Sequence, residues 1–276
     1  MVNPNERSRA SQVALDGQTQ TSVSRALDSG TPVKILCVIP ARSGSKGIPD
    51  KNIRLFRGKP LIAHSILQAR ASKYQSSLRV IVSTDSERYA EIAREFGAEC
   101  PFLRPSEISQ DFSTDLECVQ QCLDFLKMDS GYVPDCVLHL RPTQPLRSDD
   151  DVDACLDTFL RVRGEYDSLR TVTRSKKSPF KMYTISGDEP HSNGLLLKPL
   201  FETLEGITEP FNVARQALPV AYLHNGYIDI VNVDVIARGE MSGKRIYPFV
   251  MGDEKTIDID TEDDWTYAEQ RALAFV

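Results

Sequence analysis

From residue 33 onward, short apolar runs alternate with longer amphipathic stretches. Residues 33–40 (Val-Lys-Ile-Leu-Cys-Val-Ile-Pro) form a nearly continuous apolar run, which is typical of a strand buried on both faces of a parallel sheet. The same pattern predicts further elements, in chain order: helix 60–69 with Pro60 at its first position, strand 78–84, helix 86–96, helix 113–127, strand 135–140 and a helix after Ser148. Strands that alternate with helices predict an α/β fold of three layers, with a doubly wound, mainly parallel sheet in the middle.

Short signals mark the ends of several helices. Gly97 is expected to end helix 86–96. Ser148 and Asp151 match the S-x-x-D capping signature, and Thr261 and Asp264 match T-x-x-D before the last helix. Residues 256–260 alternate apolar and acidic side chains, so we expect a final strand there, followed by a helix from 265 to 275.

Two segments depart from the alternating pattern. Residues 1–32 are polar, with three basic and three acidic residues and no apolar stretch of the kind found in secretory signals, so we expect a flexible extension. Residues 174–222 contain five prolines and only short apolar runs, which a buried parallel core would not tolerate. We therefore expect one domain over 33–276, with an inserted arm, lid or dimerisation element at 174–222.

Composition excludes several classes of protein. A net charge of −6 argues against general nucleic-acid binding, and no apolar run approaches the ~20 residues that span a bilayer. None of the six cysteines forms a C-x-x-C pair, and the four histidines complete no zinc pattern. We therefore expect the thiols to be buried apolar side chains in a cytoplasmic protein that has no nucleic-acid or membrane partner.

The charges are segregated along the chain. Residues 34–59 contain seven basic side chains and one acidic one, whereas residues 251–276 contain eight acidic and two basic ones. If both segments line the same edge of the sheet, a cationic loop faces an acidic strand end, as a polyphosphate and a divalent metal would require. The alternative is that they are two solvated surfaces that never meet.

The loop after the first strand is the strongest candidate for a ligand site. It occupies the position where α/β folds bind ligands, at the carboxyl end of a strand. Gly44 and Gly47 allow close backbone approach, and Arg42, Lys46 and Lys51 offer three positive charges to phosphates. Neither the P-loop pattern nor the dinucleotide G-x-G-x-x-G pattern is present, and an ordinary solvated basic loop remains the alternative.

Residues 39–53 (IPARSGSKGIPDKNI) closely resemble the nucleotide-binding loop of the acylneuraminate cytidylyltransferases, the CMP-sialic acid synthetase-like family. The related CMP-Kdo synthetases differ in this loop. The further motifs that resemble the family follow in its order: IVSTD at 81–85, LRPSE at 103–107, LRPTQPLR at 140–147, R-Q-x-x-P at 215–219, Asn-Gly at 225–226 and IDIDT at 257–261. The likeness covers residues 34–272 and implies a nucleotide-diphospho-sugar transferase-like (Rossmann-like) fold.

The resemblance also implies a reaction, in which CTP and a nonulosonic (sialic-type) acid give the CMP-sugar and pyrophosphate. Asp258 and Asp260 alternate on the expected strand, so they face one side, and two such carboxylates need a cation between them. By resemblance they hold the catalytic Mg²⁺, as one or two ions. The implied catalytic residues are Arg42, Lys46, Lys51 and Asp260, and the implied CTP-binding residues are Ala41, Arg42, Ser43, Gly44, Lys46, Lys51, Asn52, Arg104, Asp111 and Thr114. Asp111 and Thr114 are equally compatible with the start of a helix.

The implied acceptor site departs from the family in three positions. Arg141 stands where the family usually has Gln, Gln144 replaces the usual Ser, and Asp229 occupies a place where many relatives have Tyr. Arg141 could bind a carboxylate or phosphate, or pair with a local acid. The candidate acceptor-site residues are Arg141, Gln144, Arg147, Arg215, Asn225, Tyr227 and Asp229.

Several alternatives stay open at this point. The acceptor could be a Kdo-like 2-keto sugar acid or a phosphonate, the base could differ from cytosine, or the chain could bind nucleotides or sugars without catalysis. Arg147 and Arg215 could contact the sugar carboxylate or a partner subunit. The proline-rich arm resembles the family's dimerisation element, so we expect a homodimer.

Overall fold

The computed structural model describes residues 32–186, 196–252, 254 and 256–273. The expected flexible extension lies outside the described residues, apart from residue 32. The central sheet has six strands in the order β12-β6-β11-β5-β1-β4. Their bounds are Ile35–Pro40 (β1), Leu78–Ser83 (β4), Cys136–His139 (β5), Ser168–Arg174 (β6), Tyr222–Asn232 (β11) and Ile246–Met251 (β12).

Strand β11 is antiparallel to both of its neighbours, whereas the pairs β1–β4, β1–β5 and β6–β12 are parallel. Five of the six strands therefore point the same way, which confirms the mainly parallel sheet. Strand β1 lies between β4 and β5, so the chain moves outward from β1 in opposite directions. Such a reversal opens a crevice at the carboxyl ends of the central strands.

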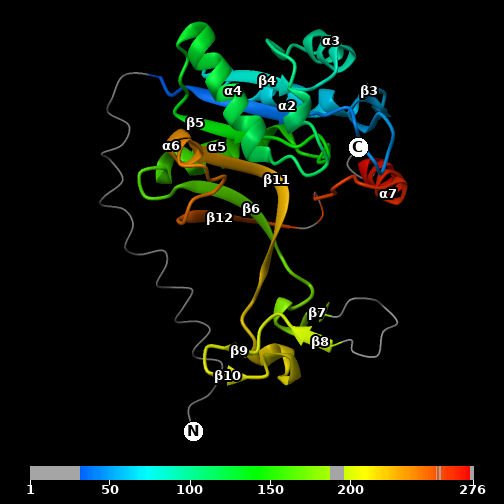
Figure 1. Ribbon diagram of the computed structural model, residues 1–276, viewed down its shortest axis with the longest axis vertical. Coiled ribbons are helices and arrows are strands. Elements are labelled where there is room, and N and C mark those ends of the chain that lie inside the picture. Colours follow the sequence, from blue (N-terminus) through cyan, green and yellow to red (C-terminus); the bar gives the residue numbers. More distant parts are fainter. Residues whose placement is uncertain (1–31, 187–195, 253, 255, 274–276) are drawn as a thin grey trace.

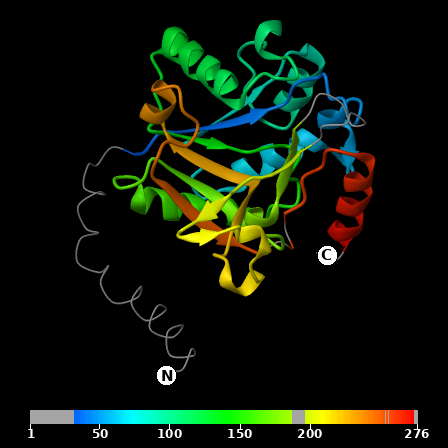
Figure 2. The ribbon, with the colours of Figure 1, turned by 60° about the horizontal axis from the view of Figure 1, so that its bottom comes forward.

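Helices cover both faces of the sheet, which confirms the three-layer architecture (Figures 1 and 2). Alternate side chains of β1 point to opposite faces. Ile35, Cys37 and Ile39 pack with one set of helices, whereas Leu36 and Val38 pack with the other. The first set is α2 (Leu61–Ala71), α3 (Glu87–Glu95) and α5 (Asp149–Val162), and the second is α4 (Asp115–Ser130) and α6 (Val233–Ala237). All six cysteines are buried, as expected.

A third, smaller apolar cluster lies beside the sheet and joins the two ends of the domain. Ile48 from the first loop and Phe56 pack there against Ile257, Ile259 and Trp265, next to the C-terminal helix α7 (Glu262–Leu273). The hairpin of β2 (Leu55–Phe56) and β3 (Lys59–Pro60) and the short 3-10 helix η2 (Lys51–Ile53) complete this corner. The cluster fastens the C-terminal segment to the loop that follows β1.

Between β6 and β11 the chain leaves the sheet and forms an arm, here defined as residues 175–221 (Figure 1). Two small antiparallel pairs build the described part of the arm. Its elements are η4 (Pro179–Lys181), β7 (Tyr183–Ser186), β8 (Leu196–Pro199), β9 (Thr203–Leu204), β10 (Ile207–Thr208), η5 (Pro210–Asn212) and η6 (Arg215–Ala217). Another 3-10 helix, η3 (Ser106–Ile108), lies before α4.

The structure corrects some of the sequence-based predictions. Residues 256–260 form no strand, because they run beside the first loop instead of along a sheet edge. Strands β6 and β12 were not predicted, and Pro60 is the N-cap of α2 rather than its first residue. The capping residues before α5 and α7 were predicted correctly. Within the described ranges, no helix is long and apolar enough to cross a membrane.

Candidate active site

A cavity of about 210 Å³ lies at the carboxyl ends of β1 and β5, where the strand order reverses. The first loop forms one wall, and the segment that follows β5 forms the opposite wall. The lining residues are Pro40, Arg42, Ser45, Lys51, Asn52, Arg104, Ser113, Thr114, Asp115, Arg141, Pro142 and Thr143. Six of the residues predicted for the site therefore line one cavity.

Hydrogen bonds to neighbouring elements hold the first loop in place. The backbone N–H and the hydroxyl of Ser43 both donate to the carboxylate of Asp85, at 2.7 and 2.9 Å, just beyond β4. The Asn52 amide donates to the carbonyl oxygen of Arg42 at 3.0 Å and so ties the two ends of the loop together. Asp50 has a left-handed backbone (φ 52°) and accepts a hydrogen bond from the Tyr89 hydroxyl of α3. The loop is therefore anchored at several points.

Two cations of the loop share one acidic partner. Asp111 forms ion pairs with Arg42, at 3.0 Å, and with Lys46. The hydrogen bond from Lys46, and then that from Arg42, lowers the pKa of the Asp111 carboxyl. Ion pairs at such exposed positions contribute little to stability. An incoming anion can therefore compete with Asp111 for both cations.

Lys51 joins the first loop to the acidic C-terminal segment. Its side chain is buried, and its ammonium donates to the carbonyl oxygen of Ile259 at 2.8 Å and to Asp260 Oδ1 at 2.9 Å. The backbones meet as well, since a Cβ atom on Gly47 would lie 2.1 Å from the carbonyl oxygen of Asp260. Of the two alternatives for the basic and acidic segments, the structure therefore shows the one in which they meet.

Asp258 and Asp260 lie on one side of this segment, although it is not a strand. Ile257 and Ile259 point into the third cluster, so the alternating carboxylates point away from it. The Ile259 N–H donates to the carbonyl oxygen of Thr143 at 3.0 Å, which places the segment against the cavity wall. Burial and then the nearby charge of Asp260 raise the pKa of the Asp258 carboxyl, against the hydrogen bond from Thr143.

This pair of carboxylates fits a hard cation. The charge of Asp260 disfavours ionisation of Asp258, and a cation beside both carboxylates would remove that penalty. Among the residues that the structure describes, no group of three or more His, Cys, Asp or Glu side chains could hold a metal. Mg²⁺ suits such an incomplete protein site, because it binds one or two carboxylates together with phosphate oxygens and water.

Other predicted nucleotide-site residues lie toward β4. Arg104 is buried, and its guanidinium donates to the carbonyl oxygen of Ser83 at 2.6 Å and to the Ser83 hydroxyl at 3.0 Å. Ala41 is buried just after β1, and its N–H also donates to Ser83. Thr114 is the N-cap of α4 and forms a capping box with Glu117. Thr114 therefore has a clear structural role while it lines the cavity.

Two residues predicted for the acceptor site, Arg141 and Asp229, form an ion pair at the wall that the segment after β5 forms. Arg141 Nη1 lies 3.0 Å from Asp229 Oδ2, and its Nη2 lies 2.8 Å from Asp115 Oδ2. Of the two alternatives for Arg141, the structure therefore places it with local acids. His139 is buried nearby, and burial lowers its pKa to about 4.

Arg147 and Tyr227 lie in the interior rather than on the cavity wall. Arg147 is 5% exposed, and its guanidinium donates to the carbonyl oxygens of Tyr227 and Arg141, both at 2.6 Å. The Tyr227 hydroxyl donates to Asp151 at 2.6 Å. Gln144 donates to the carbonyl oxygen of Asn225 at 2.7 Å. These contacts join the segment after β5 to β11, which is a structural function.

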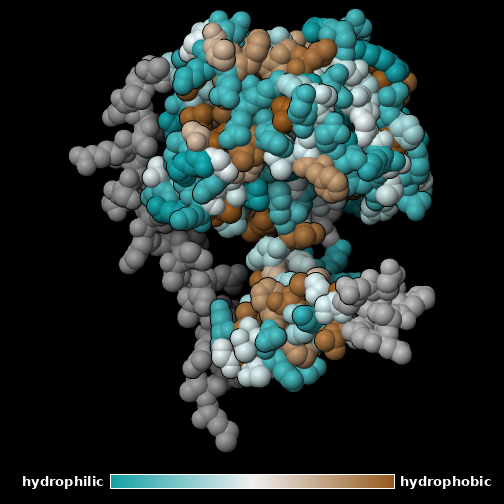
Figure 3. Space-filling view, viewed as in Figure 1, coloured by the Kyte–Doolittle hydropathy of each residue, from teal (hydrophilic) through white to brown (hydrophobic). Residues whose placement is uncertain are grey.

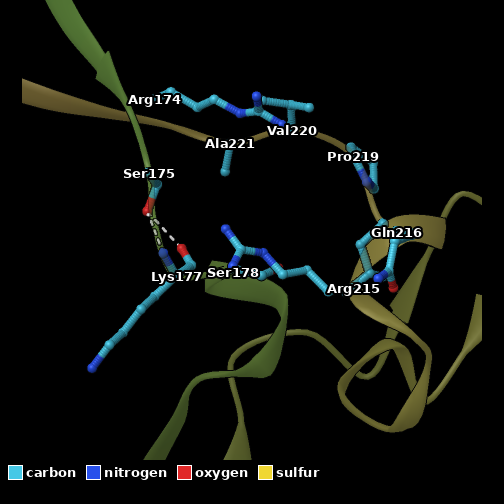
Figure 4. Close-up of a pocket in the computed structure, with 10 residues that line it drawn as sticks. Arg174, Ser175, Lys177, Ser178, Arg215, Gln216, Pro219, Val220 and Ala221 are labelled. Atoms are coloured by element: carbon cyan, nitrogen blue, oxygen red, sulfur yellow. Dashed lines mark hydrogen bonds between the residues drawn. The ribbon is translucent and has the colours of Figure 1, made fainter. Parts of the chain in front are cut away.

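Arg215 is separate from the other predicted site residues, because it belongs to the arm. It lines a second cavity, of about 320 Å³, at the root of the arm (Figure 4). Arg174 and Lys177 line the same cavity, and none of the described acidic side chains does. This second cavity is therefore a basic pocket formed where β6 and β11 leave the sheet.

Three residues of the site were not predicted: Asp85, Asp115 and Thr143. Asp85 lies two residues beyond the end of β4, at the carboxyl edge of the sheet, a position from which it could have been inferred. Thr143 lies within the LRPTQPLR motif. No local sequence pattern marks Asp115 as a site residue, because its contact with Arg141 joins residues 26 positions apart.

Comparison with known proteins places this geometry in context. A family model described as "Cytidylyltransferase" matches residues 36–185, more than half of the chain. CMP-N,N'-diacetyllegionaminic acid synthase from Legionella pneumophila is 34% identical over 86% of this chain and 96% of its own length. An N-acylneuraminate cytidylyltransferase from Streptococcus agalactiae is 30% identical over 85% of this chain, which spans only 52% of that relative.

A third relative and two solved structures agree with this picture. A pseudaminic acid cytidylyltransferase from Campylobacter jejuni is 37% identical over 49% of this chain and 56% of its own length. A structure of CMP:2-keto-3-deoxy-manno-octonic acid synthetase complexed with CTP matches with a TM-score of 0.60 and 18% identity, over 88% of this chain and 98% of the other. A cytidylyltransferase from Leptospira borgpetersenii matches with a TM-score of 0.54 and 16% identity, over 88% of each chain. These two likenesses show a shared fold.

The contact between Gly47 and Asp260 predicts that Gly47→Ala destabilises the protein. The added methyl group would overlap a backbone oxygen, so the loop and the C-terminal segment must separate, at a cost of about 1–3 kcal/mol. Urea unfolding followed by the fluorescence of Trp265, the single tryptophan, measures this loss. Gly44→Ala is the control, because its Cβ would lie 3.4 Å from the flexible side chain of Arg42. Equal unfolding midpoints for the two variants would contradict the close contact.

Proposed function

The chain belongs to the cytidylyltransferase family, and on that basis we propose that it activates a nonulosonic (sialic-type) acid with CTP. The products are the CMP-sugar and pyrophosphate. The observation that supports this proposal best is the contact between Lys51, a cation of the first loop that lines the cavity, and the Asp258–Asp260 segment. The names of the relatives indicate the acceptor class, because they specify legionaminic, N-acylneuraminic and pseudaminic acids.

In this proposal the first loop binds the triphosphate. Arg42 and Lys46 exchange Asp111 for phosphate oxygens, and Lys51 contributes a third positive charge beside Asp260. The backbone at Gly44 would approach the phosphates closely, whereas the N–H groups of Ala41 and Ser43 hold the loop through Ser83 and Asp85. Charge stabilisation of this kind favours departure of pyrophosphate, because negative charge builds up on the leaving group.

The nucleoside would lie on the β4 side of the cavity, near Asn52 and Arg104. Both side chains are buried and hydrogen-bonded to the backbone, so their positions are defined before a ligand binds. Binding to such a preorganised wall costs little conformational entropy. The preference for cytosine rests on the family to which the chain belongs.

Asp258 and Asp260 would hold Mg²⁺, which when bound would neutralise phosphate charge and favour ionisation of the attacking hydroxyl. The protein itself would keep the two carboxylates beside the phosphate-binding loop. Lys51 holds them there through its contacts with Ile259 and Asp260. The anomeric hydroxyl of the acceptor would then attack the α-phosphorus in line with the departing pyrophosphate.

A homodimer is part of the proposal. The arm exposes many large apolar side chains, and brown hydrophobic residues gather on it in Figure 3. The exposed set on the arm includes Tyr183, Ile185, Leu197, Leu200 and Phe201. Patches of this kind mark interaction sites. We infer that a second copy covers this surface, and that the basic pocket containing Arg215 lies near the partner's acceptor.

The six free, buried thiols support a cytoplasmic location.

Pyrophosphate release from CTP, measured with Mg²⁺ across a panel of acceptors, tests the function. The panel contains N-acetylneuraminic, legionaminic and pseudaminic acids, Kdo, and a control without acceptor. We expect release with one or more nonulosonic acids and little release without acceptor. Replacement of CTP by UTP, ATP or GTP should abolish release. A folded protein that binds CTP but is silent with every acid would contradict the proposal.

The proposed metal site predicts the effect of Asp260→Asn. Loss of one charged ligand should weaken Mg²⁺ binding and reduce turnover by roughly two orders of magnitude, while the fold remains. Titration of pyrophosphate release against Mg²⁺ concentration measures both effects. Asp263→Asn makes the same chemical change at an exposed position on α7 and should behave as wild type. Wild-type kinetics for Asp260→Asn would place the metal elsewhere.

The proposed dimer predicts the effect of charges on the arm. Ile185 and Leu197 are 70% and 64% exposed and lie directly opposite each other on β7 and β8. The double substitution Ile185→Glu and Leu197→Glu should halve the molar mass measured by light scattering, because a buried interface does not tolerate unpaired carboxylates. Thr184→Glu on the same strand, with its side chain on the opposite face, is the control. A double variant that keeps the wild-type mass would exclude this surface as the interface.

A further inference from the structure

Arg141 is held between two carboxylates from different parts of the fold. Asp115, the first residue of α4, lies 2.8 Å from Nη2, and Asp229 of β11 lies 3.0 Å from Nη1. A guanidinium is planar, so two partners on different nitrogens define both its position and its orientation. Arg141 therefore presents a fixed face to the cavity that it lines.

Asp229 cannot itself contact a ligand in the cavity. It is 3% exposed, and its carboxylate also receives His224 Nε2 at 2.9 Å and lies 3.6 Å from Arg170 Nε. Burial raises the pKa of this carboxyl, but the hydrogen bond from His224 and the nearby cations outweigh burial and hold the pKa well below its usual range. Asp229 is therefore an ionised group whose contacts are all made within the protein.

The backbone of β11 is shaped to allow these contacts. Its register shifts between His224 and Asp229, an irregularity that lets His224 turn back onto the carboxylate. Gly226, within the shift, has φ 65°, and a Cβ atom there would lie 3.2 Å from Arg141 Nη1. Glycine at this position suits both the left-handed backbone and the close approach of the guanidinium.

The sheet order indicates what Arg141 faces. The loop after β1 lies between the other two positions, because Arg104 lies toward β4 and Arg141 follows β5 on the side of β11 and the arm. With phosphates at the central loop and the nucleoside toward β4, the remaining side belongs to the acceptor. The two carboxylates around Arg141 compensate its positive charge, so it offers directed N–H donors rather than net attraction for an anion.

We propose that Asp229 is a positioning residue that orients Arg141 toward an uncharged oxygen of the acceptor, a hydroxyl or an acyl carbonyl, and that this ion pair determines which acceptor is used. The inference rests on the proposed function, because it assumes an acceptor sugar. It assigns to Asp229 an action through Arg141 rather than a contact with the substrate. Recognition of a hydroxyl or carbonyl by a fixed donor discriminates strongly against analogues that lack it.

Steady-state kinetics of Arg141→Gln, Asp229→Asn and the double variant test this inference. With the best acceptor of the panel, each single variant should raise the KM for the acceptor by about tenfold, while the KM for CTP stays within about twofold. The double variant should resemble Arg141→Gln alone, since the two residues act through one contact. The preference among the nonulosonic acids should shrink in all three variants.

Two further sets of variants separate positioning from general stability. Asp234→Asn removes a carboxylate from an exposed ion pair with Arg238 on α6 and should leave both KM values unchanged. His224→Ala should raise the KM for the acceptor, whereas His224→Gln, which keeps an N–H donor toward Asp229, should restore it. These two variants and Arg141→Gln keep the test decisive if Asp229→Asn does not fold.

Defined outcomes would overturn the inference. An unchanged KM for the acceptor in Asp229→Asn, beside a raised value in Arg141→Gln, would show that Asp229 does not position Arg141. A KM for CTP that rises with that for the acceptor would place Arg141 at the nucleotide. Effects that simply add in the double variant would show two independent roles. Failure of the proposed function looks different, because the wild-type protein itself would then release no pyrophosphate with any acceptor.

Discussion

The candidate active site depends on the burial of one ammonium group between two distant parts of the chain. Lys51 closes the first loop, and its charge is compensated by the carbonyl oxygen of Ile259 and the carboxylate of Asp260. A buried ammonium requires hydrogen-bond acceptors and a nearby negative charge, and Lys51 has both. The two carboxylates of the C-terminal segment lie beside the first loop because this contact, and the glycine next to it, bring the backbones together. Without it the cations of the first loop would have no pair of carboxylates next to them.

Three arginines near the cavity but beyond the first loop differ in what their guanidinium groups contact. The guanidinium of Arg147 donates to backbone carbonyl oxygens in the interior and so holds the segment after β5 against β11. Arg104 is fixed at Ser83, on the β4 side of the cavity. Arg141 is fixed by carboxylates and still lines the cavity. The burial and the partners of each guanidinium, rather than its position in a motif, distinguish these roles.

The sequence predicts the central elements well because their signals are local. The apolar run of β1, the periodicity of the helices and the capping residues need no knowledge of the rest of the chain. Strand β6 was missed because polar residues interrupt it, and edge strand β12 because it is half exposed and contains Pro248. The strand predicted at 256–260 was wrong because the alternation of Ile and Asp reflects a segment between an apolar cluster and a cavity, not a sheet. Partners such as Asp111 and Asp115 depend on the tertiary fold, which no local pattern encodes.

The third apolar cluster has a consequence for motion. The loop after β1 and the helix α7 are held to each other by a small core of their own, next to the two large clusters that hold the sheet. Segments with a small separate core open at a lower free energy than the whole domain, as amide hydrogen exchange detects in other proteins. The loop after β1, which forms one wall of the cavity, can therefore open together with α7 as one cooperative unit while the sheet stays folded. Such partial opening gives a bulky product a way out that does not require global unfolding.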